Sequence, residues 1–137
     1  MALLRGHATL TRQMDAVLRE RHELTLNEFE VLLHLAGAKD ERLRRVDLAQ
    51  RLLVTQGGVT RLLAGLEKRD LVKRASCETD ARVVYACLTE DGRGRLKAAL
   101  RTHREDVQRL FSDNFSEPEL DRLAELLGRL SGGAILE

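Results

Sequence analysis

The chain has 137 residues, of which 43% are hydrophobic, 33% charged and only 3% aromatic, with a formal net charge of +1. This length and balance suit a single soluble domain with a buried core, and the few aromatic residues argue against a stacking platform for single-stranded nucleic acid. No apolar run is long enough to span a membrane and no signal peptide is recognisable, so we expect a cytoplasmic protein without a membrane partner.

Residues 3–23 are predicted to form a helix with an apolar residue at every seventh position. The repeating positions are Leu3, Leu10, Val17 and Leu24. This spacing is typical of a packing seam between the helices of two chains. It also fits a helix that covers the core of its own chain, and the sequence leaves both interpretations open.

A second helix is predicted after Thr25, because Thr25 and Glu28 have the spacing of a capping box. The helix should end near Gly37, and residues 38–41 should form a loop before a short strand at 42–44. Its predicted inward-facing residues are Phe29, Leu32, Leu33 and Ala36.

The next segment predicts a helix-turn-helix. Residues 46–53 form a short helix, Val54 turns the chain, and Thr55 caps a longer helix that extends to Lys68. The apolar stripe expected to be buried consists of Val59, Leu62, Leu63 and Leu66. The opposite face carries hydrogen-bonding or small residues and one strong cation, and these are Thr55, Gln56, Gly57, Thr60 and Arg61. An ordinary surface helix would show the same pattern, so the neighbouring elements decide the interpretation.

After Asp70 the apolar pattern changes to period two, which indicates strands at 71–74 and 83–88 around a polar tip at 76–81. A basic hairpin directly after a recognition helix is a wing. Thr89 should then cap a long helix whose apolar face is Leu96, Leu100, His103, Val107, Leu110 and Phe111. A second capping box at 116–119, with Pro118, starts a last helix. This helix should bury Leu120, Leu123, Leu126, Leu127 and Leu130, end at residues 131–133 and leave 132–137 as a loose tail.

Charge is unevenly distributed along the chain. Residues 42–82 contain ten basic and five acidic residues, whereas the remaining segments are net acidic. A basic middle with acidic flanks indicates a local binding site for a polyanion.

The order of these elements resembles the MarR family of winged helix-turn-helix regulators. The resemblance covers about residues 24–130 and rests on five segments: Leu48-Ala49, VTRL at 59–62, LEKRDLV at 66–72, Asp80-Ala81-Arg82 in the wing, and LTEDG at 88–92. The expected fold is mainly α with a small β wing, in one domain spanning residues 1–137.

The resemblance implies a homodimer that binds double-stranded DNA. Residues 1–24 and 90–131 would form the dimerisation helices, and residues 25–89 the DNA-binding part. Residues 55–61 would enter the major groove, and the wing would reach the adjacent minor groove. Many family members release DNA when a small anionic or aromatic ligand binds between these parts, and others respond to cysteine oxidation or to metal.

The chain departs from the family pattern at two places. Gly57 and Gly58 replace a polar pair at the start of the recognition helix, either to let DNA approach the backbone or because glycine is tolerated near a helix end. Asp70 replaces a glycine at the helix end, where an acidic residue opposes the helix dipole, and this puts the local geometry in doubt.

The DNA-binding candidates follow from these placements. Arg61 is the predicted base contact, with Gln56 and Thr60 beside it. Arg82 is predicted to enter the minor groove, oriented by Asp80, and the alternative is that the Asp80–Arg82 pair only holds the hairpin together. The predicted phosphate contacts or solvated charges are Arg44, Arg45, Arg51, Lys73 and Arg74.

Other chemistry has weaker support. Cys77 lies close in sequence to Lys73 and Arg74, whose charges would lower a thiol pKa, so it is a redox candidate or an incidental residue, and Cys87 is expected to be a packing residue. The two cysteines and four histidines show no metal-ligand spacing, and no nucleophile elbow or phosphate-binding loop is present. We therefore expect no metal, no cofactor and no enzyme.

The sequence thus predicts a sequence-specific transcriptional regulator, a ligand-responsive repressor that binds an inverted-repeat operator as a homodimer. The alternative is a winged-helix interaction module that has lost specific DNA binding, and the two glycines of the recognition helix keep this alternative open.

Overall fold

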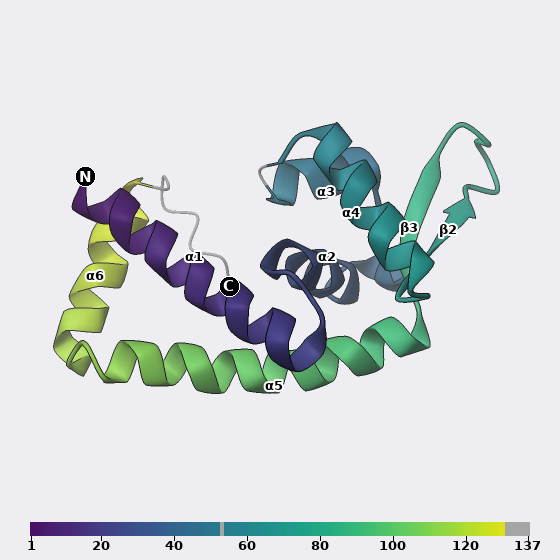
Figure 1. Ribbon diagram of the computed structural model, residues 1–137. Coiled ribbons are helices and arrows are strands. Elements are labelled where there is room, and N and C mark those ends of the chain that lie inside the picture. Colours follow the sequence, from purple (N-terminus) through teal and green to yellow (C-terminus); the bar gives the residue numbers. More distant parts are fainter. Residues whose placement is uncertain (53, 131–137) are drawn as a thin grey trace. The chain divides into compact units, whose positions relative to one another are not determined.

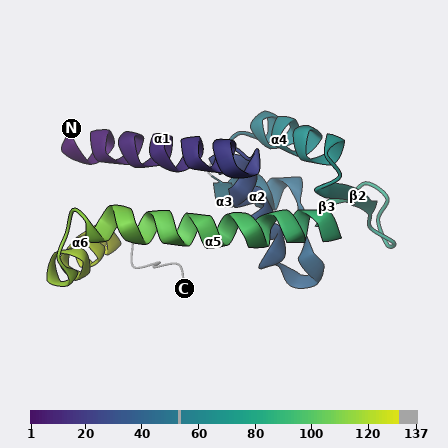
Figure 2. The ribbon, with the colours of Figure 1, turned by 60° about the horizontal axis from the view of Figure 1, so that its bottom comes forward.

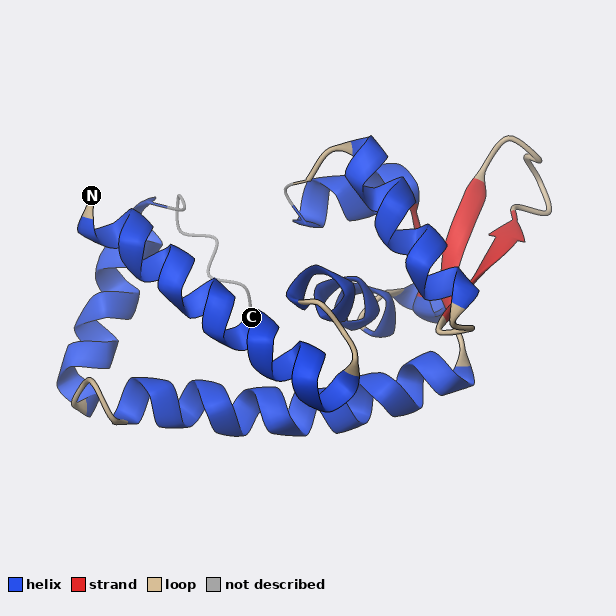
Figure 3. Ribbon diagram, viewed as in Figure 1, coloured by secondary structure: helices blue, strands red, loops and turns tan. Residues whose placement is uncertain are grey.

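The computed structural model describes residues 1–52 and 54–130 and is mainly helical with a small antiparallel sheet (Figure 1, Figure 3). The helices are α1 (Ala2–His22), α2 (Leu26–Ala36), α3 (Arg45–Leu52), α4 (Gln56–Lys68), α5 (Glu90–Ser112) and α6 (Glu117–Leu130). The strands are β1 (Arg42–Arg44), β2 (Val72–Ser76) and β3 (Val84–Leu88), and a 3₁₀ turn, η1, covers Lys39–Glu41. The chain divides into two compact units, Met1–Thr102 and His103–Glu137. No described helix is long and apolar enough to cross a membrane.

The first unit has one hydrophobic core, built from α2, α3 and α4 together with β2, β3 and the start of α5. Its fully buried side chains include Phe29, Leu32, Leu35, Leu48 and Leu66. The predicted inward position of Leu33 is wrong, since that side chain is 39% exposed. The buried face of α2 is centred near Leu32 and Leu35, and Leu33 lies just past its edge.

The sheet has the strand order β1-β3-β2, with β3 in the centre. The predicted hairpin is confirmed, and β1 adds a third strand on the other side of β3, where Leu43 lies opposite Ala86. Residues 38–41, predicted as a loop, contain η1.

The first helix is buried only near its C-terminal end. Leu18 is the buried residue of α1, and Leu24 is completely buried in the turn that follows. Leu3, at the other end of the predicted seam, is 55% exposed. The C-terminal end of α1 lies beside α5, where His22 and Thr102 share a 2.8 Å hydrogen bond and Arg95 donates to the carbonyl of His22 at 2.7 Å (Figure 2).

The second unit contains the end of α5 and all of α6. At the start of α6, the Glu119 carboxylate accepts a 2.8 Å hydrogen bond from the backbone N–H of Ser116, as the predicted capping box requires. The predicted burial of the α6 leucines is wrong within the chain: Leu120 and Leu123 are half-buried, and Leu126, Leu127 and Leu130 are exposed. A unit of this size encloses too little volume for a closed core. The predicted helix stop at residues 131–133 and the predicted tail at 132–137 lie outside the described residues.

Candidate nucleic-acid interface

The α4 helix is held in place by its N-terminal cap and by the apolar face that packs against the core. Thr55 Oγ1 accepts from the backbone N–H of Gly58 at 3.1 Å, which confirms the predicted cap. Val59, Leu63 and Leu66 are buried and Leu62 is half-buried against the core, so the predicted stripe is confirmed. This packing determines which side of α4 faces solvent.

The solvent side of α4 begins with Gln56, Gly57, Thr60 and Arg61, all exposed. Thr60 Oγ1 donates to the carbonyl of Gln56 at 3.0 Å, and Arg61 has no ion-pair partner among the described residues. A Cβ at Gly57 would approach nothing closer than 4.0 Å, so no contact within the chain requires glycine there.

Position 58 differs, because a Cβ there would lie 3.3 Å from Thr55 Oγ1. A side chain at residue 58 would therefore crowd the hydroxyl of the capping residue Thr55. Gly57 is exposed on the solvent side of α4.

Two neighbouring arginines, Arg44 at the end of β1 and Arg45 at the start of α3, have different surroundings. Arg44 donates to both carboxylate oxygens of Asp47, at 2.8 and 3.0 Å, and this hydrogen bonding holds the pKa of Asp47 below its usual value. Arg45 donates to the Thr60 hydroxyl at 3.5 Å and has no ion-pair partner among the residues that the structure describes. Arg45 is thus the freer cation of the two.

In the wing, neighbouring residues of β2 point to opposite faces of the sheet. Arg74 Nε donates to both carboxylate oxygens of Glu67 in α4, at 2.8 and 2.9 Å. Lys73 is exposed on the other face and has no ion-pair partner in the described part of the chain. The sequence motif around Leu66–Val72 contains Glu67, but its link to Arg74 was not predicted.

At the hairpin tip, Asp80 and Arg82 interact. Asp80 Oδ1 accepts from the backbone N–H of Arg82 at 3.0 Å and from its Nε at 3.3 Å. The contact uses one carboxylate oxygen and leaves the Arg82 side chain 93% exposed. This geometry is compatible with both predicted roles of the pair.

The two cysteines have different environments. The pKa of the Cys77 thiol is lowered, first by the Thr79 hydroxyl, 3.2 Å from Sγ, and then by backbone N–H groups of Thr79 and Asp80. This cause differs from the predicted effect of Lys73 and Arg74. Cys87 is buried, as a packing residue would be, and burial raises its pKa. The described residues contain no group of histidine, cysteine or acidic side chains that could hold a metal ion.

A surface hollow of about 350 Å³ lies between the end of α1, the start of α2 and the end of α4. Arg69 lines it, donating to the carbonyl of Glu23 at 2.6 Å and pairing with Glu28 Oε1 at 2.7 Å. Sequence reasoning assigned no role to Arg69, because its partners are far away along the chain. Arg19 lies at the same hollow and pairs with Asp15.

The chain is similar to several known regulators. Residues 22–83 match the model described as the MarR family. The HTH-type transcriptional repressor YetL of Bacillus subtilis is 35% identical over 107 residues, which are 78% of this chain and 64% of that protein. An uncharacterized HTH-type transcriptional regulator of Bacillus cereus is 32% identical over 120 residues, 88% of this chain and 78% of that protein.

Solved structures agree with these relatives. AbsC, a MarR family transcriptional regulator from Streptomyces coelicolor, is 28% identical with a TM-score of 0.86, over 96% of this chain and 88% of that chain. FabT of Streptococcus pneumoniae, solved in complex with DNA, is 26% identical with a TM-score of 0.77, over 96% of this chain and 91% of that chain. The expectation of a regulator rather than an enzyme agrees with all of them. With the helix-turn-helix and the wing in the expected order, the chain belongs to the MarR family of winged helix-turn-helix transcriptional regulators.

Proposed function

We propose that the chain is a repressor that binds double-stranded DNA sequence-specifically, with α4 in the major groove. The observation that carries the proposal is the exposed start of α4, where Gln56, Thr60 and Arg61 lie on a helix held by its buried stripe. Arginine and glutamine pair with base edges in that groove, and a helix N-terminus favours phosphate. The DNA complex of the similar FabT and the repressor name of the similar YetL support this assignment.

The active form is proposed to be a homodimer built through α1, α5 and α6. Exposed apolar side chains support this: Leu3, Leu4, Leu126, Leu127 and Leu130. Each would gain roughly 25 cal/mol for every Å² of apolar surface that a second copy removes from water. A dimer presents two α4 helices to an inverted repeat with half-site centres about 10 bp apart.

Release by a small anionic or aromatic ligand completes the proposal. The hollow lined by Arg19 and Arg69 is the proposed ligand site, because a ligand bound there would contact both the end of α1 and the end of α4. A ligand there changes DNA affinity only if it binds one spacing of the α4 helices better than another. If saturating anionic and aromatic ligands leave operator affinity unchanged, this part of the proposal is wrong.

The decisive experiment is selection from random duplex DNA by the purified protein, followed by a salt titration on the selected duplex. A palindromic motif and a steep salt dependence are expected, because phosphate neutralisation supplies much of the affinity. Salt-sensitive binding without a motif would contradict sequence specificity. Absence of binding, in protein freed of small ligands by unfolding and refolding, would favour the alternative of an interaction module.

A further inference from the structure

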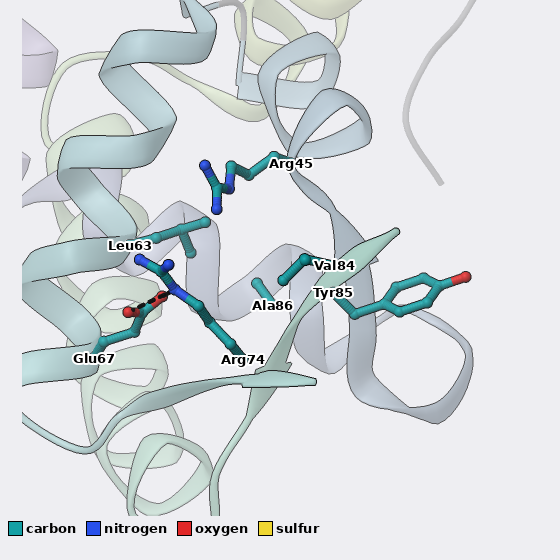
Figure 4. Close-up of a pocket in the computed structure, with 7 residues that line it drawn as sticks. All are labelled: Arg45, Leu63, Glu67, Arg74, Val84, Tyr85 and Ala86. Carbon is teal, nitrogen blue, oxygen red and sulfur yellow. Dashed lines mark hydrogen bonds and ion pairs between the residues drawn. The ribbon is translucent and has the colours of Figure 1, made fainter. Parts of the chain in front are cut away.

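The recognition helix α4 and the wing meet at a seam lined by Leu63, Glu67, Arg74 and Ala86. The Glu67–Arg74 ion pair spans this seam (Figure 4). Leu63 and Glu67 lie one helical turn apart on α4 and line the seam opposite Arg74 and Ala86. The hollow under the pair has a volume of about 10 Å³, which is room for one water molecule and no ligand. The seam is therefore a packing contact between the recognition helix and the wing.

Strand alternation decides which cation enters this seam. Arg74 lies opposite Ala86 of β3, whereas Lys73 lies opposite Cys87, which also faces Arg42 of β1. Since successive side chains of a strand point to opposite faces, Arg74 faces α4 and Lys73 faces away from it. Two adjacent cations of one strand therefore have different surroundings.

We propose that Arg74 is a positioning residue that fixes the angle of the wing on α4 through Glu67 and does not contact a phosphate. The proposal rests on the proposed DNA-binding function and reassigns one of its predicted phosphate contacts. Within the described parts of the chain, Glu67–Arg74 is the only ion pair that joins α4 to the hairpin. Arg82 lies farther along the same hairpin, so the angle of the hairpin determines where the Arg82 guanidinium meets DNA.

The charge of the pair supports this role. A guanidinium that neutralises a carboxylate displaces few counterions from DNA, because the pair carries no net charge. Arg74 is 53% exposed and Glu67 23% exposed, so the pair is screened by solvent and its effect is modest. We expect the loss of either charge to raise the equilibrium constant for opening of the hairpin away from α4 by about three- to fivefold.

The test compares Arg74→Gln, Glu67→Gln, the double variant and Lys73→Gln as the matched control. Lys73→Gln removes the same charge from the adjacent residue without touching Glu67. In the free protein, hydrogen exchange of the hairpin amides should accelerate about three- to fivefold in both seam variants and no further in the double variant. Lys73→Gln should leave this exchange unchanged. Exchange that is unaffected by Arg74→Gln and Glu67→Gln would overturn the proposal.

The second measurement is the salt dependence of operator affinity. Arg74→Gln should weaken binding without changing the slope of log affinity against log salt. A slope reduced by about 0.9, the value for one lost phosphate contact on duplex DNA, would overturn the proposal. The charge swap Glu67→Arg with Arg74→Glu should restore both slow exchange and affinity. If the wild-type protein binds no duplex, the proposed function fails, and the exchange measurement alone decides the role of Arg74.

Discussion

Thr89 Oγ1 donates a 2.6 Å hydrogen bond to the carbonyl of Asp70, which links the start of α5 to the turn after α4. Asp70 has a φ of 57°, in the left-handed region that residues with a Cβ rarely occupy. This is the position at which the family pattern has a glycine. Aspartate is among the few residues that adopt this conformation, so the departure changes the residue and keeps the backbone geometry.

Asp70→Gly should raise the free energy of unfolding by about 0.5–1 kcal/mol. Glycine adopts the left-handed conformation without steric cost. The substitution also removes the acidic charge of Asp70 from the unfavourable end of the α4 dipole. Urea unfolding followed by circular dichroism measures the change. Asp70→Ala is the control and should destabilise, because alanine tolerates this φ less well than aspartate. A destabilised Asp70→Gly variant would contradict this explanation.

Gly92 lies in the first turn of α5 at a place without room for a side chain. A Cβ at residue 92 would lie 2.1 Å from the carbonyl oxygen of Leu71, whereas a Cβ at Gly94 would meet nothing within 4 Å. Gly92→Ala should therefore destabilise the fold by about 3 kcal/mol, as backbone must move to relieve the overlap. Gly94→Ala, in the same helix, should stabilise it by up to about 1 kcal/mol. Equal midpoints in urea for the two variants would refute the close approach of α5 to Leu71.

Local sequence signals predicted most of the winged part correctly. The capping box of α2 is present in full: Thr25 Oγ1 accepts from the N–H of Glu28 at 3.0 Å, and Glu28 Oε2 accepts from the N–H of Thr25 at 2.9 Å. The cap at Thr55 and the period-two pattern of the wing were confirmed in the same way. These signals act within a few residues, so one sequence is enough to read them.

Other features depend on groups far apart in the chain. Arg69 reaches the carbonyl of Glu23, 46 positions earlier, and no local pattern predicts that contact. Leu33 was misplaced because the spacing of apolar residues defines a face of α2, whereas its neighbours decide the exact centre of burial. The roles of the candidate DNA contacts remain predictions. Arg44 and Arg74 nevertheless differ from Arg61, because each of them forms an ion pair within the chain.

Arg61→Ala should reduce operator affinity by about 1–3 kcal/mol and relax base preference at one position in each half-site. Arg61 is exposed on α4 without an ion-pair partner among the described residues, so its guanidinium is available to a base edge. Binding to the selected operator and to its single-base variants measures both effects. Arg51→Ala, which removes an exposed cation outside α4, is the control and should keep the order of preference. An unchanged preference in Arg61→Ala would remove Arg61 from base recognition.

Cys77 should react with iodoacetamide near neutral pH much faster than Cys87. The Thr79 hydroxyl and nearby N–H groups lower the pKa of Cys77, so its reactive thiolate forms at lower pH, whereas burial raises the pKa of Cys87. Mass spectrometry of tryptic peptides follows both sites, and unfolded protein should label them at similar rates.

Thr79→Val tests the cause of the lowered pKa, because it removes the hydroxyl that lies 3.2 Å from Cys77 Sγ and keeps the shape of the side chain. The midpoint of the pH dependence of labelling should move to higher pH, and labelling near neutral pH should slow as the thiolate fraction falls. Thr9→Val, at an exposed site on α1, is the matched control and should leave the midpoint in place. If the midpoint is the same in Thr79→Val and in the wild type, the Thr79 hydroxyl does not activate Cys77, and the backbone N–H groups of Thr79 and Asp80 account for the lowered pKa.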